Sequence, residues 1–247
     1  MPRYFIEVFY KGTGYAGLQI QQNANSIQAE IEKALRILLK ENYFLTGASR
    51  TDAGVHAQSN YFHFDAEAVT LQDTEQLKRY TYSLNAILPS GIVVKRIFPV
   101  SPQAHCRFDA ISREYKYYIY KEKDPFNSDR AYFFPYKLDI NLLNQAANIL
   151  LSYHDFTSFS KRNTQVSTFN CTIMLSKWIQ EEHLLVYNVK ANRFLRGMVR
   201  GLVGTMLKVG TGKVTPENFC KIIESRNSAN AYFSVPPQGL FLVNVQY

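Results

Sequence analysis

The sequence predicts an α+β protein of two ferredoxin-like halves, each in the order β-α-β-β-α-β, with antiparallel sheets packed side by side around a central cleft. Strand-like segments rich in aromatic and β-branched residues alternate with segments whose apolar residues recur at helical spacing. The same order can be followed twice along the chain, and 46% of its 247 residues are hydrophobic, enough for a sizeable core. We place the boundary near residues 102–108, between domains 1–104 and 105–247.

The first half opens with residues 3–10 (RYFIEVFY), whose aromatic and β-branched side chains predict a strand. Asn25 or Ser26 can cap a helix that runs to about Lys40, because apolar residues there recur every three or four positions. The other expected elements are a short strand at 43–48, a loop at 49–56, a strand at 59–65, a helix that begins at Asp73 and a strand at 92–100.

The second half opens with a strand at 113–121, and Asp139 caps the helix that follows. A hairpin at 170–180 and 184–191, a helix at about 194–209, a short helix opened by Thr215 and a strand at 239–247 complete it. On the helix at 194–209, we expect Arg196 and Arg200 to lie one turn apart, with Arg193 on the same side. This face would form a basic ridge opposite the apolar face.

The net charge of +8, from 28 Lys and Arg against 20 Asp and Glu, favours a polyanionic partner. The chain also has 17 Tyr and 17 Phe, and flipped-out bases stack on such rings, although most of them will form the core. A basic surface without any partner is the alternative that charge alone leaves open.

The cysteines Cys106, Cys171 and Cys220 are widely spaced, so we expect three buried thiols and no disulfide framework. The histidines are equally scattered, and no spacing fits a closed zinc site, so no metal is expected. No apolar run approaches the roughly 18 residues of a membrane span. The first residues lead directly into a strand pattern, and we therefore expect a cytoplasmic protein.

Residues 49–56 (SRTDAGVH) are the most unusual local feature. Arg50 and Asp52 are two residues apart, and Ala53-Gly54 permits a tight turn. A carboxylate beside a guanidinium stays ionised, and a positioned, ionised Asp can act as a nucleophile or a base. By itself the pattern more often marks a turn-forming Asp with a surface Arg as its partner.

The segment RTDAGVH at 50–56 closely resembles the signature loop of the TruA family of tRNA pseudouridine synthases. Further segments resemble the family's motifs in the same order and cover nearly the whole chain. They are YKGTGYAGLQIQQ at 10–22, SIQ at 26–28, NAILP at 85–89, HCRF at 105–108, YKY at 115–117, DFTSF at 155–159, NRFLRGMVR at 192–200 and GLFL at 239–242. The segment at 105–108 resembles the family's H-A-R-F.

This resemblance implies a role for four residues. Asp52 aligns with the essential catalytic aspartate, and Tyr115 with the tyrosine that stacks in the uridine pocket. Arg50 aligns with an arginine thought to help flip the base, and Arg200 with one that pairs with the catalytic carboxylate. The chain departs from the family at Ser49, where Gly is usual, and at Leu18, where an aromatic residue is usual; Arg196 also lies where other members are often uncharged or carry His.

The resemblance implies isomerisation of uridine to pseudouridine in the tRNA anticodon stem-loop, around positions 38–40, where unstacked loop bases are accessible. It also implies a homodimer and no cofactor. Asp52 could attack C1′ or abstract the 2′ proton, and the sequence leaves both routes open. The other classes considered are a non-catalytic RNA-binding module and a metal-dependent nuclease with Asp52, Asp65 and Asp109 as ligands.

Overall fold

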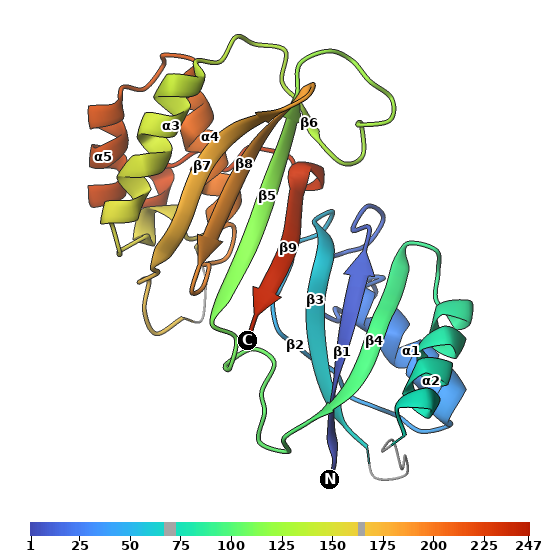
Figure 1. Ribbon diagram of the computed structural model, residues 1–247. Coiled ribbons are helices and arrows are strands. Elements are labelled where there is room, and N and C mark those ends of the chain that lie inside the picture. The colour runs from blue at the N-terminus through green and yellow to red at the C-terminus, as the bar shows by residue number, and fades with distance from the viewer. Residues whose placement is uncertain (67–72, 163–165) are drawn as a thin grey trace. The chain divides into compact units, whose positions relative to one another are not determined.

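A computed structural model describes residues 1–66, 73–162 and 166–247 of the protein. Within these described residues, nine strands, mostly paired antiparallel, and five α-helices confirm the predicted α+β class (Figure 1). The chain divides into two compact units, of which the first contains residues 1–111 and 242–247 and the second residues 112–241. The chain thus first passes from one unit to the other after Ile111, whereas the sequence placed the domain boundary after residue 104.

The first unit has the element order β-α-β-β-α-β, with β1 (Arg3–Tyr10) at the centre of its sheet. β1 pairs antiparallel with β3 (His56–Asp65) and with β4 (Ile92–Val100), and the two-residue β2 (Thr46–Gly47) pairs with β3. The strand expected at 43–48 is therefore shorter, and the strand expected at 59 begins earlier. Residues 4–8 of β1 are all buried, as a central strand with both faces covered requires.

The two helices of this unit begin at the capping residues that the sequence predicts. Ser26 precedes α1 (Ile27–Leu39), and its Oγ accepts from the Ala29 amide at 3.3 Å. Asp73 caps α2 (Thr74–Ile87) through the Glu75 amide at 2.9 Å. A buried stripe on α1, made by Ile27, Ile31, Ala34 and Leu35, fixes which face of that helix is turned into the core.

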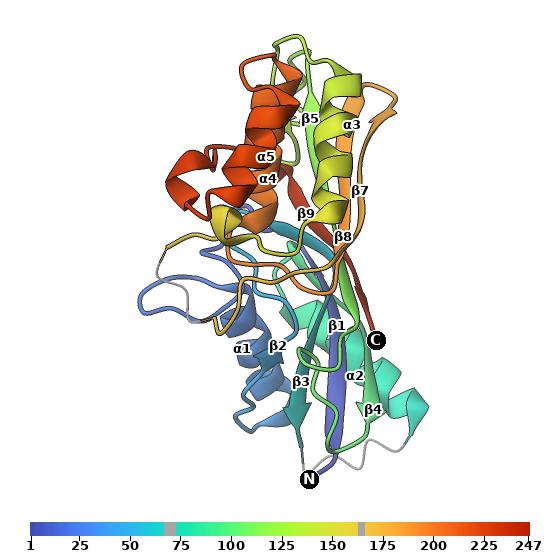
Figure 2. The same cartoon turned by 90° about the vertical axis from the view of Figure 1, so that its left-hand side faces the viewer.

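The second unit has a sheet in the order β5-β8-β7, all antiparallel, with helices beside it (Figure 2). Its strands are β5 (Ser112–Tyr120), β6 (Tyr132–Phe133), β7 (Ile173–Glu181) and β8 (Leu184–Ala191), and its α-helices are α3 (Ile140–Ile149), α4 (Met198–Gly210) and α5 (Pro216–Glu224). Asp139 and Thr215 cap α3 and α5 as predicted. Short 3-10 helices lie at Leu150–Ser152, Thr157–Phe159, Ser228–Asn230 and Pro237–Gly239.

The predicted start of the helix at 194 is wrong, because α4 begins at Met198. Gly197 has φ +74°, a left-handed conformation that interrupts the helical path, and the Asn192 side chain accepts from the Arg193 amide at 2.8 Å. Leu195 is buried and continues the apolar spacing of the helix backwards, which explains the wrong expectation. Of the three arginines placed on a helical ridge, only Arg200 lies on α4.

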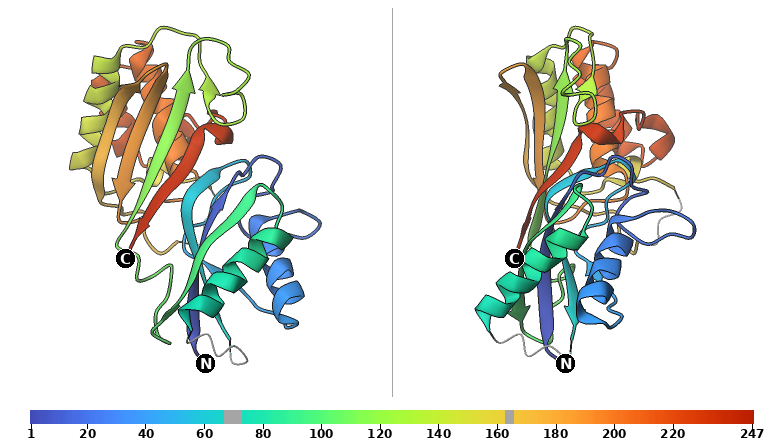
Figure 3. Two further views of the ribbon diagram at one scale, coloured as in Figure 1. Left: turned by 45° about the vertical axis from the view of Figure 1, so that its right-hand side comes forward. Right: turned by 90° about the vertical axis from the view of Figure 1, so that its right-hand side faces the viewer.

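The strand β9 (Leu240–Gln246) has its first two residues in the second unit and the others in the first. Figure 3 shows β9 in red, at the C-terminal end of the colour scale. In the first unit, the Ile111 amide donates to Gln246 O at 2.7 Å, and the Tyr247 ring packs edge-on against Tyr61 with ring centroids 5.2 Å apart. None of the described helices combines the length and apolarity needed to cross a bilayer.

Candidate functional site

The loop that carries Arg50 and Asp52 leads from β2 to β3, and buried polar contacts fix its first residues. The Thr51 Oγ1 lies 2.8 Å from the Tyr10 hydroxyl. Asn60 Nδ2 donates to the Tyr10 hydroxyl at 3.1 Å and to Ser49 O at 2.9 Å. The backbone on both sides of Arg50 is therefore attached to residues of β1 and β3, two strands of one sheet.

Asp52 itself opens the tight turn that the sequence predicts. Its carbonyl oxygen accepts from the Val55 amide at 3.2 Å, and Gly54 takes a left-handed φ of +78°. Val55 is buried and Asp52 is half-buried. Because Thr51 and Val55 are both anchored in the core, the Asp52 backbone is held from its two sides and the turn has a fixed position in its unit.

A second loop, at 12–18, packs against this one through glycine backbones. A Cβ on Gly12 would lie 2.0 Å from Val55 O, and a Cβ on Gly17, whose φ is +101°, would lie 2.8 Å from Thr51 O. The Leu18 amide donates to Thr51 O at 3.1 Å, and the Gly12 amide to His56 Nδ1 at 3.2 Å. This contact was not predicted, although the three glycines at 12–17 were its signal.

The two departures from the TruA pattern beside this loop keep its packing intact. Leu18 is fully buried, and a Cβ on Gly47 would lie 2.9 Å from its Cδ2, so its side chain fills the core between the loops. Ser49 is also buried, and among the described residues its Oγ has no hydrogen-bond partner. Ser49 thus adds a buried hydroxyl where Gly would add none.

Arg50 lies in the exposed part of this loop. Its side chain makes no hydrogen bond or ion pair with any residue that the structure describes. An Arg50–Asp52 ion pair within the loop is therefore not what orients Asp52. The guanidinium is instead available to a ligand in solution.

Tyr115 and Arg200 lie in the second unit. Tyr115 is a buried residue of β5, and its ring packs edge-to-face on Phe194 with centroids 5.1 Å apart. Arg200, in the first turn of α4, donates from Nε and Nη2 to Val235 O at 2.9 and 2.7 Å. The Tyr117 hydroxyl donates to the next carbonyl, Pro236 O, at 2.7 Å, so β5 and α4 together hold residues 235–236.

Basic residues gather along the irregular segment 192–197 of the second unit, where a helix was expected. Arg113 Nη1 donates to Asn192 O at 3.0 Å, and the Lys161 amide donates to Arg196 O at 3.0 Å. A Cβ on Gly197 would lie 3.0 Å from Lys161 Cγ. Arg193 and Arg196 thus acquire two further cations as neighbours, Arg113 and Lys161, which sequence reasoning missed because they come from other elements.

The carboxylates proposed as ligands in a nuclease do not form a cluster within the described residues. Asp65 makes two hydrogen bonds to Arg3, at 2.7 and 2.8 Å, and Asp109 accepts from the His105 amide at 2.7 Å. The one group of potential metal ligands that the described residues bring together is His63, His105 and Cys106, which excludes Asp52. The arrangement therefore gives no support to metal-dependent cleavage at Asp52.

The chain is similar to proteins of one family along its full length. A family model described as tRNA pseudouridine synthase matches residues 146–247. A tRNA pseudouridine synthase A of Parabacteroides distasonis is 47% identical over 247 residues, which is all of this chain and 96% of that protein. A tRNA pseudouridine synthase A of Bacteroides fragilis is 48% identical over 248 residues, which cover 100% of this chain and 97% of that protein. One from Staphylococcus aureus is 34% identical over 245 residues, which cover 98% of this chain and 91% of that protein.

Proposed function

The chain belongs to the tRNA pseudouridine synthase family, and from this we propose that it isomerises uridine to pseudouridine in the anticodon stem-loop of tRNA, with Asp52 as the essential carboxylate. The observation that carries the proposal is the similarity over the whole chain. The firmly anchored turn at Asp52 supports the choice of residue. We place the target uridines around positions 38–40, in a loop whose bases are open to recognition.

The reaction breaks the C1′–N1 bond, turns the uracil and forms a C1′–C5 bond, while the C5 proton leaves and N1 gains one. An enzyme reaches these atoms only when the nucleotide is out of its stack. A carboxylate serves this chemistry in one of two ways, by attack on C1′ or by removal of the 2′ proton. Both need an Asp that is held in position, and the contacts of Thr51 and Val55 supply this.

Three further residues complete the proposed substrate site, on the strength of the resemblance. Arg50 is exposed and suited to enter the space that a flipped base leaves. Tyr115 offers a ring to the uracil, with its orientation fixed by Phe194. Arg200 contributes a guanidinium, part of which already binds Val235 O. The cations of segment 192–197 add attraction for phosphates.

We further propose that each half is ferredoxin-like, with the catalytic loop in the N-terminal half, and that the enzyme acts as a homodimer in the cytoplasm. The strand order β4-β1-β3 with β2 beside β3 supports the first part for the N-terminal half. A dimer would double the basic surface that one chain with a net charge of +8 offers to tRNA. Light scattering of the purified chain with and without tRNA measures the stoichiometry directly.

Pseudouridine mapping on anticodon stem-loop transcripts tests the function, with wild type and Asp52→Asn compared. Asp129→Asn is the matched control, because Asp129 forms an ion pair with its neighbour Arg130 in the other unit. We expect modification by wild type and the control and none by Asp52→Asn. Modification by Asp52→Asn at the wild-type rate would refute the catalytic assignment, and a wild type that binds but never modifies RNA would favour the binding module.

A further inference from the structure

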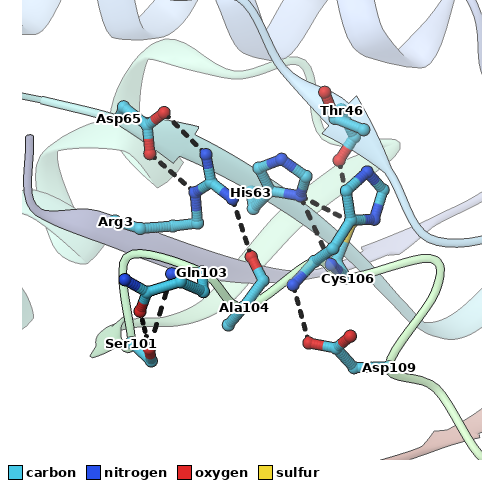
Figure 4. A network of polar contacts seen from close by, with 10 residues as sticks. Arg3, Thr46, His63, Asp65, Ser101, Gln103, Ala104, Cys106 and Asp109 are labelled. Carbon is cyan, nitrogen blue, oxygen red and sulfur yellow. Dashed lines mark hydrogen bonds and ion pairs between the residues drawn. The ribbon is translucent and has the colours of Figure 1, made fainter.

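A cluster of two imidazoles and a thiol lies in the first unit, apart from the Asp52 loop. His63 belongs to β3, and His105 and Cys106 belong to the segment that follows β4. Their potential ligand atoms all lie within 4.8 Å of one another. His63 Nδ1 is 3.2 Å from Cys106 Sγ (Figure 4). The imidazole rings of His63 and His105 have their centroids 4.6 Å apart.

The surrounding contacts hold the segment 101–111 on this strand. The Arg3 guanidinium binds the Asp65 carboxylate and also donates to Ala104 O at 2.9 Å, next to the cluster (Figure 4). The Asp109 carboxylate accepts from the His105 amide at 2.7 Å. The three side chains are therefore brought together by a network of fixed contacts.

Each of the three side chains offers one donor atom to a metal. His63 Nδ1 accepts from the Cys106 amide at 3.3 Å, and His105 Nδ1 accepts from the Arg107 and Phe108 amides at 3.1 and 3.3 Å. Both Nδ1 atoms are therefore unprotonated, and a metal bound to them would replace these hydrogen bonds. The Cys106 thiol donates to Thr46 O at 3.0 Å, and metal binding would send its proton to solvent.

We propose that His63, His105 and Cys106 bind one Zn²⁺ ion, which ties segment 101–111 to β3. Imidazole nitrogen and thiolate sulfur are the ligands that zinc takes, at about 2.0–2.3 Å, so tetrahedral donors lie about 3.5 Å apart. The cluster needs to contract by roughly 1 Å to reach this geometry. His105 is half-buried, which leaves water access to the fourth position.

The Cys106 thiol departs from the family motif that this segment resembles. In the TruA motif that residues 105–108 resemble, Ala stands at the position of Cys106, so the thiol is an addition to the pattern. The sequence predicted no metal because His63 and Cys106 are 43 residues apart, and no closed-site spacing joins them.

A titration of the purified, tag-free chain with Co²⁺ tests the site, because a cobalt–thiolate bond gives a charge-transfer absorption that imidazole ligands alone do not. We expect one Co²⁺ per chain with this absorption, and its loss when Zn²⁺ is added. Cys106→Ala should abolish the band, whereas Cys220→Ala, which removes a half-buried thiol elsewhere, should keep it. Absence of the band in wild type, or its persistence in Cys106→Ala, would overturn the proposal.

Cys106→Ala introduces the residue of the related motif, so it is expected to fold, and circular dichroism verifies this. His105→Gln provides a second variant that keeps the thiol, and its Co²⁺ affinity should fall at least about ten-fold. Zn²⁺ should raise the melting temperature of wild type and leave that of Cys106→Ala unchanged. Equal shifts in both proteins would show that zinc binds elsewhere and would refute the assignment.

Discussion

The Tyr10 hydroxyl lies 2.8 Å from the Thr51 hydroxyl, in a buried contact between β1 and the residue that precedes Asp52. The same Tyr10 oxygen accepts from Asn60 of β3 at 3.1 Å. Burial raises the pKa of Tyr10 to about 12, so the phenol stays neutral and remains a donor over the whole physiological range. One hydroxyl thus connects the two central strands to the proposed catalytic turn.

Tyr10→Phe removes this hydroxyl and leaves two buried partners unsatisfied. We expect the free energy of unfolding to fall by about 1–3 kcal/mol. The turnover number should fall about ten-fold, with little change in KM, because the turn at Asp52 loses an anchor. Urea unfolding and single-turnover modification assays measure the two effects. Tyr43→Phe is the control, because its hydroxyl binds Glu41, and a similar drop in turnover there would disprove the anchoring role.

Gly12→Ala should damage the enzyme far more than Gly14→Ala. A Cβ on Gly12 would overlap Val55 O, whereas a Cβ on Gly14 meets nothing within 4 Å and only strains a φ of +87°. We expect losses of about 3 kcal/mol for Gly12→Ala and about 1 kcal/mol for Gly14→Ala. Thermal unfolding measures both, and equal losses would argue against the packing of the two loops.

Arg50→Ala separates binding chemistry from stability. The side chain is exposed and makes no contact that folding depends on, so the free energy of unfolding should change by less than about 0.5 kcal/mol. Modification should nevertheless slow by about ten-fold or more, a change of at least 1.4 kcal/mol in the barrier. Arg36→Ala, which removes an exposed cation from α1, is the control. A turnover number of Arg50→Ala equal to that of wild type would refute the assignment of Arg50 to the substrate site.

Arg200→Lys keeps a positive charge but loses the fork that binds Val235 O. Because a lysine cannot reproduce two N–H bonds that converge on one oxygen, we expect a loss of about 1–2 kcal/mol in stability and reduced turnover. Arg193→Lys, outside α4, should retain stability. Full turnover in Arg200→Lys would show that charge alone is what Arg200 supplies, and guanidinium geometry would then have no part in the reaction.

Glu7 gives the first unit a dependence on pH. Burial alone would raise the pKa of its carboxyl, but the hydrogen bond from Arg96 and the charges of Arg96 and Lys95 outweigh burial and lower it. Since the folded pKa lies below the ordinary 4.5, the stabilisation is complete above that pH and is lost as pH falls further. Glu7→Gln should therefore be less stable than wild type at pH 7, by about 1–2 kcal/mol because both cations are largely exposed.

Urea unfolding of wild type and Glu7→Gln between pH 7 and pH 3 measures this difference. The difference in free energy of unfolding between wild type and Glu7→Gln should become smaller below about pH 4.5, because the Glu7 carboxylate of wild type takes up a proton there. Gln180→Glu, far along the chain in β7, controls for the general effect of one charge. A gap that stays constant over this range would contradict the role of the ion pairs.

Elements specified by local patterns were predicted closely from the sequence. The strands Arg3–Tyr10 and Ile92–Val100 have the expected bounds, and Ser26, Asp73, Asp139 and Thr215 cap the helices as expected. Periodicity and capping act over a few residues, so they can be seen in the chain itself. The same reasoning failed at Phe194, because a buried Leu195 imitates a helical face where Gly197 breaks the helix.

The residues that surround Asp52 could be identified only from the three-dimensional structure. The loop at 49–56 was singled out by its composition, but Tyr10 and Asn60, which hold it, come from separate strands. His63 and Cys106 likewise meet only because β3 and the segment after β4 lie together. Such contacts form between segments that are distant in the sequence, so the spacing of residues along the chain does not predict them.

The chain passes between its two units twice, after Ile111 and after Phe241. This arrangement affects when the first unit can complete its contacts during translation. Residues 242–247 emerge from the ribosome only after all of the second unit, yet Tyr247 packs on Phe5 and Tyr61 and donates to Cys106 O at 2.8 Å. Translation proceeds at about 5–20 residues per second. The nascent first unit therefore lacks the contacts of Tyr247 with Phe5 and Tyr61 for several seconds while the second unit is synthesised.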